Sequence, residues 1–128
     1  MIQEAYVSFE TAKLLKEKGF DENTLMVYMS YGDLCKCNRY DSIRNSNYND
    51  ITKNYFECTA PTLQMAMKWL REVHNIDICV FPYQADYISY SYKVKIYKNK
   101  EIYLTITDSK TYEDAVEEAI KYCLENLI

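Results

Sequence analysis

Three segments carry apolar residues at the three- and four-residue spacing of an amphipathic helix. They are VSFETAKLLKEKGF, PTLQMAMKWLREVHN and TYEDAVEEAIKYCLENLI. Ser8 and Thr111 are good N-caps for the first and third segments, and Gly19 and Asn75 are typical residues for ending the first and second. The pattern therefore predicts helices over residues 9–18, 61–74 and 112–126.

Between the second and third helices, apolar and polar residues alternate with the period of a half-buried strand. IDICVFPY, ISYSYKVKIY and EIYLTIT follow one another, and Asn99-Lys100 has the right length for a two-residue hairpin between the last two. In the last strand, alternation directs Ile102 toward the core together with Leu104 and Ile106. The second half is thus predicted to run helix, three-strand meander over 76–107, helix.

The first half is predicted to add further strands. TLMVYMSYGDLCKCNRY suggests two short strands about a Gly32-Asp33 turn, and YFEC suggests a third. Residues 41–54 are rich in Asn, Ser and Asp without an apolar period, which predicts an exposed loop. At 128 residues, we expect one α+β domain, in which these N-terminal strands join the antiparallel meander and the helices pack mainly on one face.

Charge and composition narrow the classes of function. The net charge of −4 and the pI near 5.0 disfavour general affinity for nucleic acids. No apolar run approaches the roughly 20 residues that span a bilayer, and the first residues lack a signal-peptide pattern, so no membrane is expected. Five cysteines, an odd number without regular spacing, favour reduced thiols and a cytoplasmic location.

Several segments also resemble a known group of sequences. APTLQMAMKWLREVHNI, the Tyr-rich strands after it, YEDAVEEAIKYCLENLI and the opening VSFETAKLLKEKGF are similar to a family of short uncharacterised proteins from Bacteroidetes and their phages or prophages. The similarity covers most of the chain except the Asn-rich loop. The family has no known activity, so the resemblance implies a phage or prophage accessory protein and no mechanism.

The order of elements in the second half is that of the double-stranded-RNA-binding domain. In the members that bind RNA, a basic start to the last helix contacts phosphates. The same turn here is Tyr112, Glu113 and Asp114, and acidic side chains repel phosphate. The similarity is therefore one of architecture alone.

Cys35 and Cys37 are the best candidates for a metal site, because two thiolates one residue apart share a face of an extended strand. A tetrahedral zinc site needs further ligands, which Cys58, Cys79 and His74 would have to supply through the fold. The spacing does not require this arrangement. Thiols acting as small apolar residues are favoured, and no metal site is assigned.

The sequence contains no recognisable catalytic motif. His74 has no nucleophile or carboxylate partner in a local catalytic arrangement, so we favour a role at the C-terminal end of its helix, where it caps carbonyls. Gly19 and Gly32 are the two glycines, and neither lies in the strand-loop-helix setting that binds phosphate. We assign no catalytic residue and no cofactor, and an enzyme is less favoured than a binding protein.

The solvated face of the predicted sheet is the remaining candidate site. Alternation places on it Lys93, Lys95, Tyr97, Tyr103 and Thr105. This mixture suits a contact with another protein or stacking on bases, although it is also found on ordinary exposed sheets. We favour a non-enzymatic protein-interaction module that binds a partner or itself. The alternatives are a nucleic-acid-binding module that uses the same Lys and Tyr residues, and an enzyme of unrecognised type beside the 41–54 loop.

Overall fold

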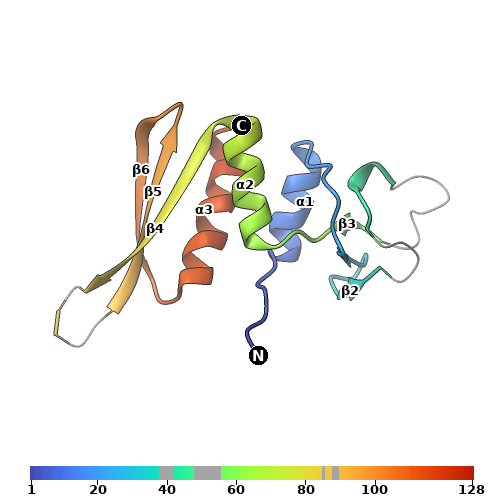
Figure 1. Cartoon of the computed structure of the whole chain (residues 1–128), viewed down its shortest axis with the longest axis horizontal. Coiled ribbons are helices and arrows are strands. Elements are labelled where there is room, and N and C mark those ends of the chain that lie inside the picture. Colours follow the sequence, from blue (N-terminus) through green and yellow to red (C-terminus); the bar gives the residue numbers. More distant parts are fainter. Residues whose placement is uncertain (38–41, 48–55, 85, 88–89) are drawn as a thin grey trace. The chain divides into compact units, whose positions relative to one another are not determined.

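The computed structural model describes residues 1–37, 42–47, 56–84, 86–87 and 90–128. Along the chain, the elements are α1 (Phe9–Glu17), β1 (Met26–Tyr28), β2 (Leu34–Lys36), the short 3-10 helix η1 (Asn45–Asn47), β3 (Cys58–Thr59), α2 (Leu63–His74), β4 (Ile76–Gln84), β5 (Tyr90–Lys98), β6 (Glu101–Ser109) and α3 (Tyr112–Asn126) (Figure 1). The predicted α+β class and the α-β-β-β-α order of the second half are confirmed.

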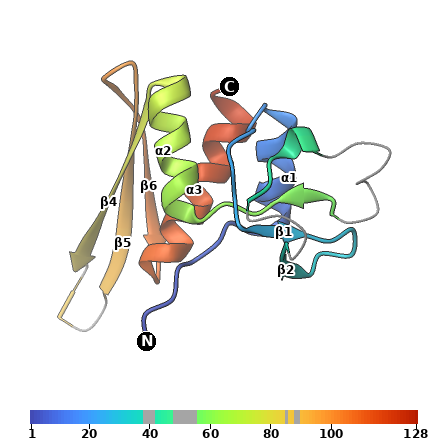
Figure 2. The same cartoon turned by 45° about the vertical axis from the view of Figure 1, so that its right-hand side comes forward.

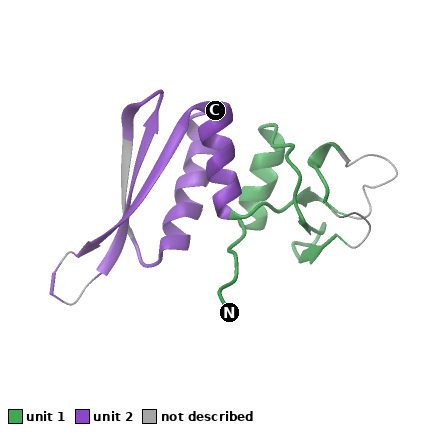
Figure 3. Ribbon diagram, in the orientation of Figure 1, with its two compact units in different colours: residues 1–62 green, residues 63–128 purple. Residues whose placement is uncertain are grey.

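Contacts divide the chain into two compact units, Met1–Thr62 and Leu63–Ile128 (Figure 3). Each unit holds one antiparallel sheet of three strands, with the order β2-β1-β3 in the first and β4-β5-β6 in the second. The strands of the first half therefore form a sheet of their own and do not extend the meander as predicted. Both edges of β1 are occupied, because Val27 lies opposite Cys35 of β2 and opposite Thr59 of β3. Folding as one domain stays a prediction.

In the first unit, α1 begins and ends as its sequence predicts. The Ser8 hydroxyl accepts a hydrogen bond from the Thr11 N–H at 3.2 Å, which caps the helix. Gly19 follows the helix with φ of 94°, in the left-handed region, and the Phe20 N–H donates to the Leu15 carbonyl at 2.9 Å. Ser8 and Gly19 thus set the limits of this helix.

The expected exposed loop over 41–54 lies only partly within the described residues, since 41 and 48–54 fall outside them. In the remaining part, Ile43 is 1% exposed and packs with Val27 and Phe56. Its backbone exchanges two hydrogen bonds of 2.8 Å with Thr24. This stretch therefore adds a residue to the core, which a single apolar position in a polar segment does not reveal.

Helix α2 begins at Leu63, later than the start at residue 61 that the sequence predicts. The Pro61 carbonyl accepts a hydrogen bond from the Val7 N–H at 3.1 Å, and Thr62 forms an isolated bridge with Tyr6. Both residues are thus held in extended pairing with the N-terminal segment. Thr59, which the sequence pattern suggests as the N-cap of this helix, lies in β3 instead.

In the second unit, helices α2 and α3 lie on the same side of the meander (Figures 1 and 2). Asn99 and Lys100 have φ values of 54° and 70°, which confirms the predicted two-residue turn between β5 and β6. Asn75 is left-handed with φ of 55° and separates α2 from β4, as expected. The fully buried residues between sheet and helices are Ile76, Val94, Ile96, Ala66, Leu70, Ala115, Val116, Ala119, Ile120, Cys123 and Leu124.

Strand β6 contains a bulge that simple alternation does not predict. Ile96 lies opposite Leu104, but Tyr97 lies opposite Ile102, so Tyr103 is an additional residue on β6. Ile102 consequently shares the side of Tyr97. It is 64% exposed, and its predicted place in the core was wrong.

Among the described residues, no helix has the length and apolar character that crossing a bilayer requires.

Candidate functional site

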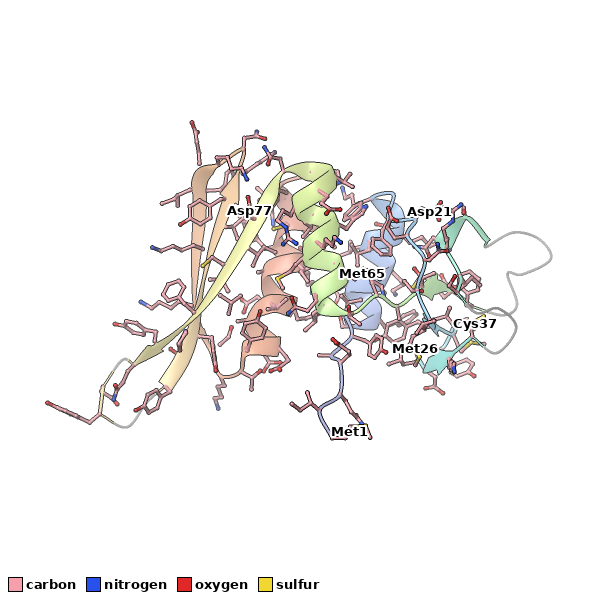
Figure 4. The ribbon with its side chains drawn as sticks, in the orientation of Figure 1. Met1, Asp21, Met26, Cys37, Met65 and Asp77 are labelled. Carbon is pink, nitrogen blue, oxygen red and sulfur yellow. The ribbon has the colours of Figure 1, made fainter. Side chains whose placement is uncertain are left out.

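The side of the meander that faces away from α2 and α3 is the candidate site, and we call it the outer face. Val94 and Ile96 of β5 are fully buried on the helix side, so the residues that alternate with them point the other way. Figure 4 shows side chains along this side of the sheet, with Asp77 labelled near one end. The described members of the outer face are Asp77, Cys79, Phe81, Tyr83, Ser91, Lys93, Lys95, Tyr97, Ile102 and Tyr103.

Two lysines on the central strand lie over aromatic rings of β4. Lys93 Nζ is 3.6 Å from the centroid of the Tyr83 ring, and Lys95 Nζ is 5.6 Å from the centroid of the Phe81 ring. The strand register places Lys93 opposite Phe81 and Lys95 opposite Cys79. Each lysine therefore leans diagonally across β4, and both do so in the same direction, which forms two consecutive cation-π pairs.

Among the described residues, no carboxylate balances the positive charge of these lysines. Within the described part of the chain, neither Lys93 nor Lys95 forms a salt bridge. Asp77 is an acidic residue of the outer face. Its Oδ2 atom is 3.3 Å from Lys100 Nζ at the β5–β6 turn, so this carboxylate already forms a salt bridge. The centre of the outer face is cationic in a chain whose net charge is −4.

Large exposed side chains lie on the outer face at both ends of the stretch that holds the two lysines. Ile102 and Tyr103 are 64% and 54% exposed on one flank, and Tyr83 is 40% exposed on the other. Both Ile102 and Tyr103 face outward because the bulge sets two residues of β6 against Tyr97. Large exposed apolar side chains grouped in this way are typical of surfaces that contact another molecule.

The sequence predicts part of this surface. Lys93, Lys95 and Tyr97 lie together on β5 as expected, and Tyr103 lies beside them on β6. Thr105 has its backbone opposite Lys95, and its side chain lies outside the described residues.

The sequence pattern did not predict that β4 and Ile102 contribute to the outer face. IDICVFPY is apolar on both faces, so no polar stripe indicates which of its residues are solvated. The diagonal contacts of Tyr83 and Phe81 with the lysines depend on strand register, which alternation within one strand does not reveal.

Both edges of the meander carry features that hinder the addition of another strand. Pro82 lies within the edge strand β4 and has no N–H to donate. The other edge strand, β6, has register shifts between Tyr92 and Val94 and between Ile96 and Tyr97 of its partner strand. Proline and bulges are the usual means by which edge strands avoid pairing, so the outer face is the better contact surface.

The structure does not gather the cysteines into a metal site. Of the described residues, no three His, Cys, Asp or Glu side chains are placed to hold a metal ion. Cys35 and Cys37 are half-buried, and Cys37 packs partly against the core around Val27. Burial raises the pKa of the Cys58 thiol to about 12, which keeps it protonated and disfavours metal binding.

His74 is placed by packing and not by a catalytic partner. Its ring meets the Trp69 ring edge-on, with the centroids 4.8 Å apart. Burial lowers the pKa of His74, and the positive charge of Lys98 lowers it further. Nε2 is buried without a hydrogen-bond partner, so this atom does not cap a carbonyl of the helix. Trp69 and Lys98, the residues that act on the His74 ring, supply neither a nucleophile nor a carboxylate.

Comparison of this chain with protein-family models, curated proteins and solved structures finds no match.

Proposed function

We propose that this chain is a small, non-enzymatic protein-interaction module and that its outer face is the binding surface. The observation that carries the proposal is the pair of exposed residues Ile102 and Tyr103, which the β6 bulge turns outward beside Tyr97, on the same face as Lys93 and Lys95. The helices of the same unit cover the opposite side of the sheet, so the outer face is the side on which a partner would lie.

The chemistry of the outer face supports a protein partner. Aromatic residues are enriched at the centres of protein interfaces, where their rings bury much area while losing little side-chain entropy. Phe81 and Tyr83 lie on the strand β4 of this surface, with a lysine of the central strand over each ring. The guarded edges of β4 and β6 direct a partner to the face and away from strand addition.

The suggested resemblance to short Bacteroidetes and phage or prophage proteins gives this proposal a context. An accessory protein of a phage or prophage would act in the cytoplasm of its host and would meet host or phage proteins there. A binding module without cofactors fits that setting.

A nucleic-acid-binding module is the second candidate. It is favoured by two lysines that pair with no described carboxylate and that share a face with Tyr97 and Tyr103. The net charge of −4 and the acidic first turn of α3, with Glu113 and Asp114, oppose it. We therefore rank it second.

A pull-down from the native host tests the leading proposal. The face variant carries Lys93→Glu and Lys95→Glu. The control variant carries Lys68→Glu and Lys110→Glu, which make the same charge change at exposed residues outside the strands of the meander. We expect proteins that the wild type and the control variant retain and the face variant loses. A set of proteins that all three chains retain equally would contradict the proposal.

The thiol of Cys79 gives a second, direct measurement. Cys79 is exposed on the outer face, opposite Lys95. A partner that covers this face must slow the reaction of Cys79 with a maleimide, in a background where Cys35 and Cys37 are replaced by serine. A purified partner that leaves the Cys79 rate unchanged binds elsewhere, and the outer face would then be rejected as its site.

A further inference from the structure

We infer that the partner of the outer face is a segment of a different protein, in which carboxylates alternate with apolar side chains along an extended backbone. This inference rests on the proposed function and names the chemistry of the partner. It follows from the spacing of the two lysines, from their aromatic surroundings and from the symmetry that a second copy would impose.

The spacing of the lysines matches alternate residues of an extended chain. Lys93 and Lys95 are two positions apart on β5, which corresponds to about 6.6 Å along a strand. An extended segment lying along β5 presents every second side chain to the sheet with the same repeat. Acidic residues at two such positions can meet both ammonium groups at once.

The surroundings of the lysines favour carboxylates that are flanked by apolar groups. Each ammonium lies over an aromatic ring, and neither forms a salt bridge with a described carboxylate. A partner that covers Ile102 and Tyr103 removes water from the same area, which strengthens the attraction between the ammonium groups and incoming carboxylates.

A second copy of this chain does not supply that complement. A two-fold dimer brings the same patch of both copies together, and the lysines are on the central strand of the three. The pairing of two outer faces would set cations against cations, while Asp77 is already engaged by Lys100. Two molecules of net charge −4 also repel each other at a distance.

Selection from a phage-displayed library of random peptides tests the inference. The wild type should enrich peptides with two Asp or Glu residues separated by one residue and flanked by apolar residues. The control variant, Lys68→Glu with Lys110→Glu, should enrich the same peptides, and the face variant should not. Synthetic versions of the enriched peptides should slow the maleimide reaction of Cys79.

The contribution of the carboxylates is measured on one enriched peptide. Replacing its two acidic residues by Gln or Asn should weaken binding about tenfold, as expected for two partly exposed charge pairs. Lys93→Arg with Lys95→Arg should retain binding, because the charges are kept. Both results are needed to support the inference.

The possible failures separate the inference from the proposed function. Neutral or basic peptides that protect Cys79 would overturn the acidic partner and leave the interaction module standing. A library that yields no peptide protecting Cys79 would overturn both. Binding of a twelve-residue oligothymidine that the face variant loses would replace the protein partner with nucleic acid. If light scattering shows a dimer for the wild type and a monomer for the face variant, a second copy of this chain would replace the different protein as the partner.

Discussion

The side chain of Asn45 holds the backbone of Thr59 through a hydrogen bond of 2.9 Å, in which the Thr59 N–H donates to Oδ1. Nδ2 of the same side chain donates to the Phe20 carbonyl at 2.7 Å. Asn45 is 8% exposed, so both bonds are shielded from water. One amide group therefore joins the segment after α1 to strand β3.

Replacing Asn45 by alanine should lower the free energy of unfolding by about 2–3 kcal/mol. The change leaves the buried N–H of Thr59 and the buried carbonyl of Phe20 without the hydrogen-bond partner that Asn45 provides. Buried polar groups without hydrogen bonds lower the free energy of unfolding. Ser46→Ala is the matched control, because Ser46 bonds to Asp21 through its backbone N–H, which alanine retains. Urea unfolding should show almost no loss for the control. Equal losses for both variants would contradict the assigned role of Asn45.

Replacing Trp69 by alanine should destabilise the protein by about 3–5 kcal/mol, because this large side chain is 6% exposed and its removal leaves a cavity. Val73 on the same helix serves as the control. The apolar spacing of α2 predicts Val73 in the core, but the structure leaves it 57% exposed. Val73→Ala should therefore change stability by no more than about 0.5 kcal/mol. Thermal or urea unfolding distinguishes the two, and similar losses would mean that Trp69 is not a core residue.

The cysteines should differ widely in reactivity in the native protein. Burial raises the pKa of the Cys58 and Cys123 thiols to about 12, so neither supplies thiolate near neutral pH. Cys79 is exposed and should be the fastest to react with a disulfide reagent, followed by the half-buried Cys35 and Cys37. Mass spectrometry of partly modified protein checks this order. Early modification of Cys58 or Cys123 without denaturant would contradict their burial.

Stability should fall in mild acid partly because of His74. Its pKa is lowered by burial and by the charge of Lys98, so the unfolded chain takes up a proton at a higher pH than the folded one. The resulting loss begins as the pH falls through about 6.5, the ordinary value for histidine, and is complete below the folded pKa. Above that range, His74 is neutral in both states and contributes no pH dependence.

The variant His74→Gln isolates this effect. Its free energy of unfolding should fall less than that of the wild type between about pH 8 and about pH 5, because it cannot take up the proton. The comparison uses the slope against pH, so a constant offset from the lost contact with Trp69 does not matter. Parallel slopes would show that His74 is not responsible.

The elements that could be predicted from the sequence are those that local chemistry determines. Ser8 and Thr111 cap their helices through their own hydroxyls, which accept from N–H groups three residues on. Asn75 and Asn99 adopt left-handed backbone conformations as their positions in the sequence suggest. For the outer face, alternation within β5 was enough to identify Lys93 among its members.

The bulge in β6 could not be predicted from the turn or from the apolar alternation alone. It is needed because these two patterns require different registers between β5 and β6. The two-residue turn sets Lys98 opposite Glu101. The alternation of apolar residues sets Ile96 opposite Leu104, and the two registers differ by one residue. An additional residue between Glu101 and Leu104 satisfies both, and it is this residue that brings Ile102 to the outer face.

Pairing between segments that are distant in the sequence explains the remaining differences between the predicted and the observed fold. Strand β2 follows β1 directly, but the other neighbour of β1 is β3, which lies far along the chain, so the complete separate sheet of the first half is not visible in any short pattern. The burial of Ile43 and Asn45 likewise depends on Thr24, Phe20 and Thr59, which are distant in the sequence.

The hydrogen bond between Val7 and Pro61 has a kinetic consequence. It joins the two ends of the first unit, so this unit is complete only when a long loop has closed, with the entropy loss that closure entails. The meander of the second unit pairs strands that are consecutive in the chain, and such low contact order favours rapid folding. We expect the half of the chain that is synthesised later to reach its native contacts sooner.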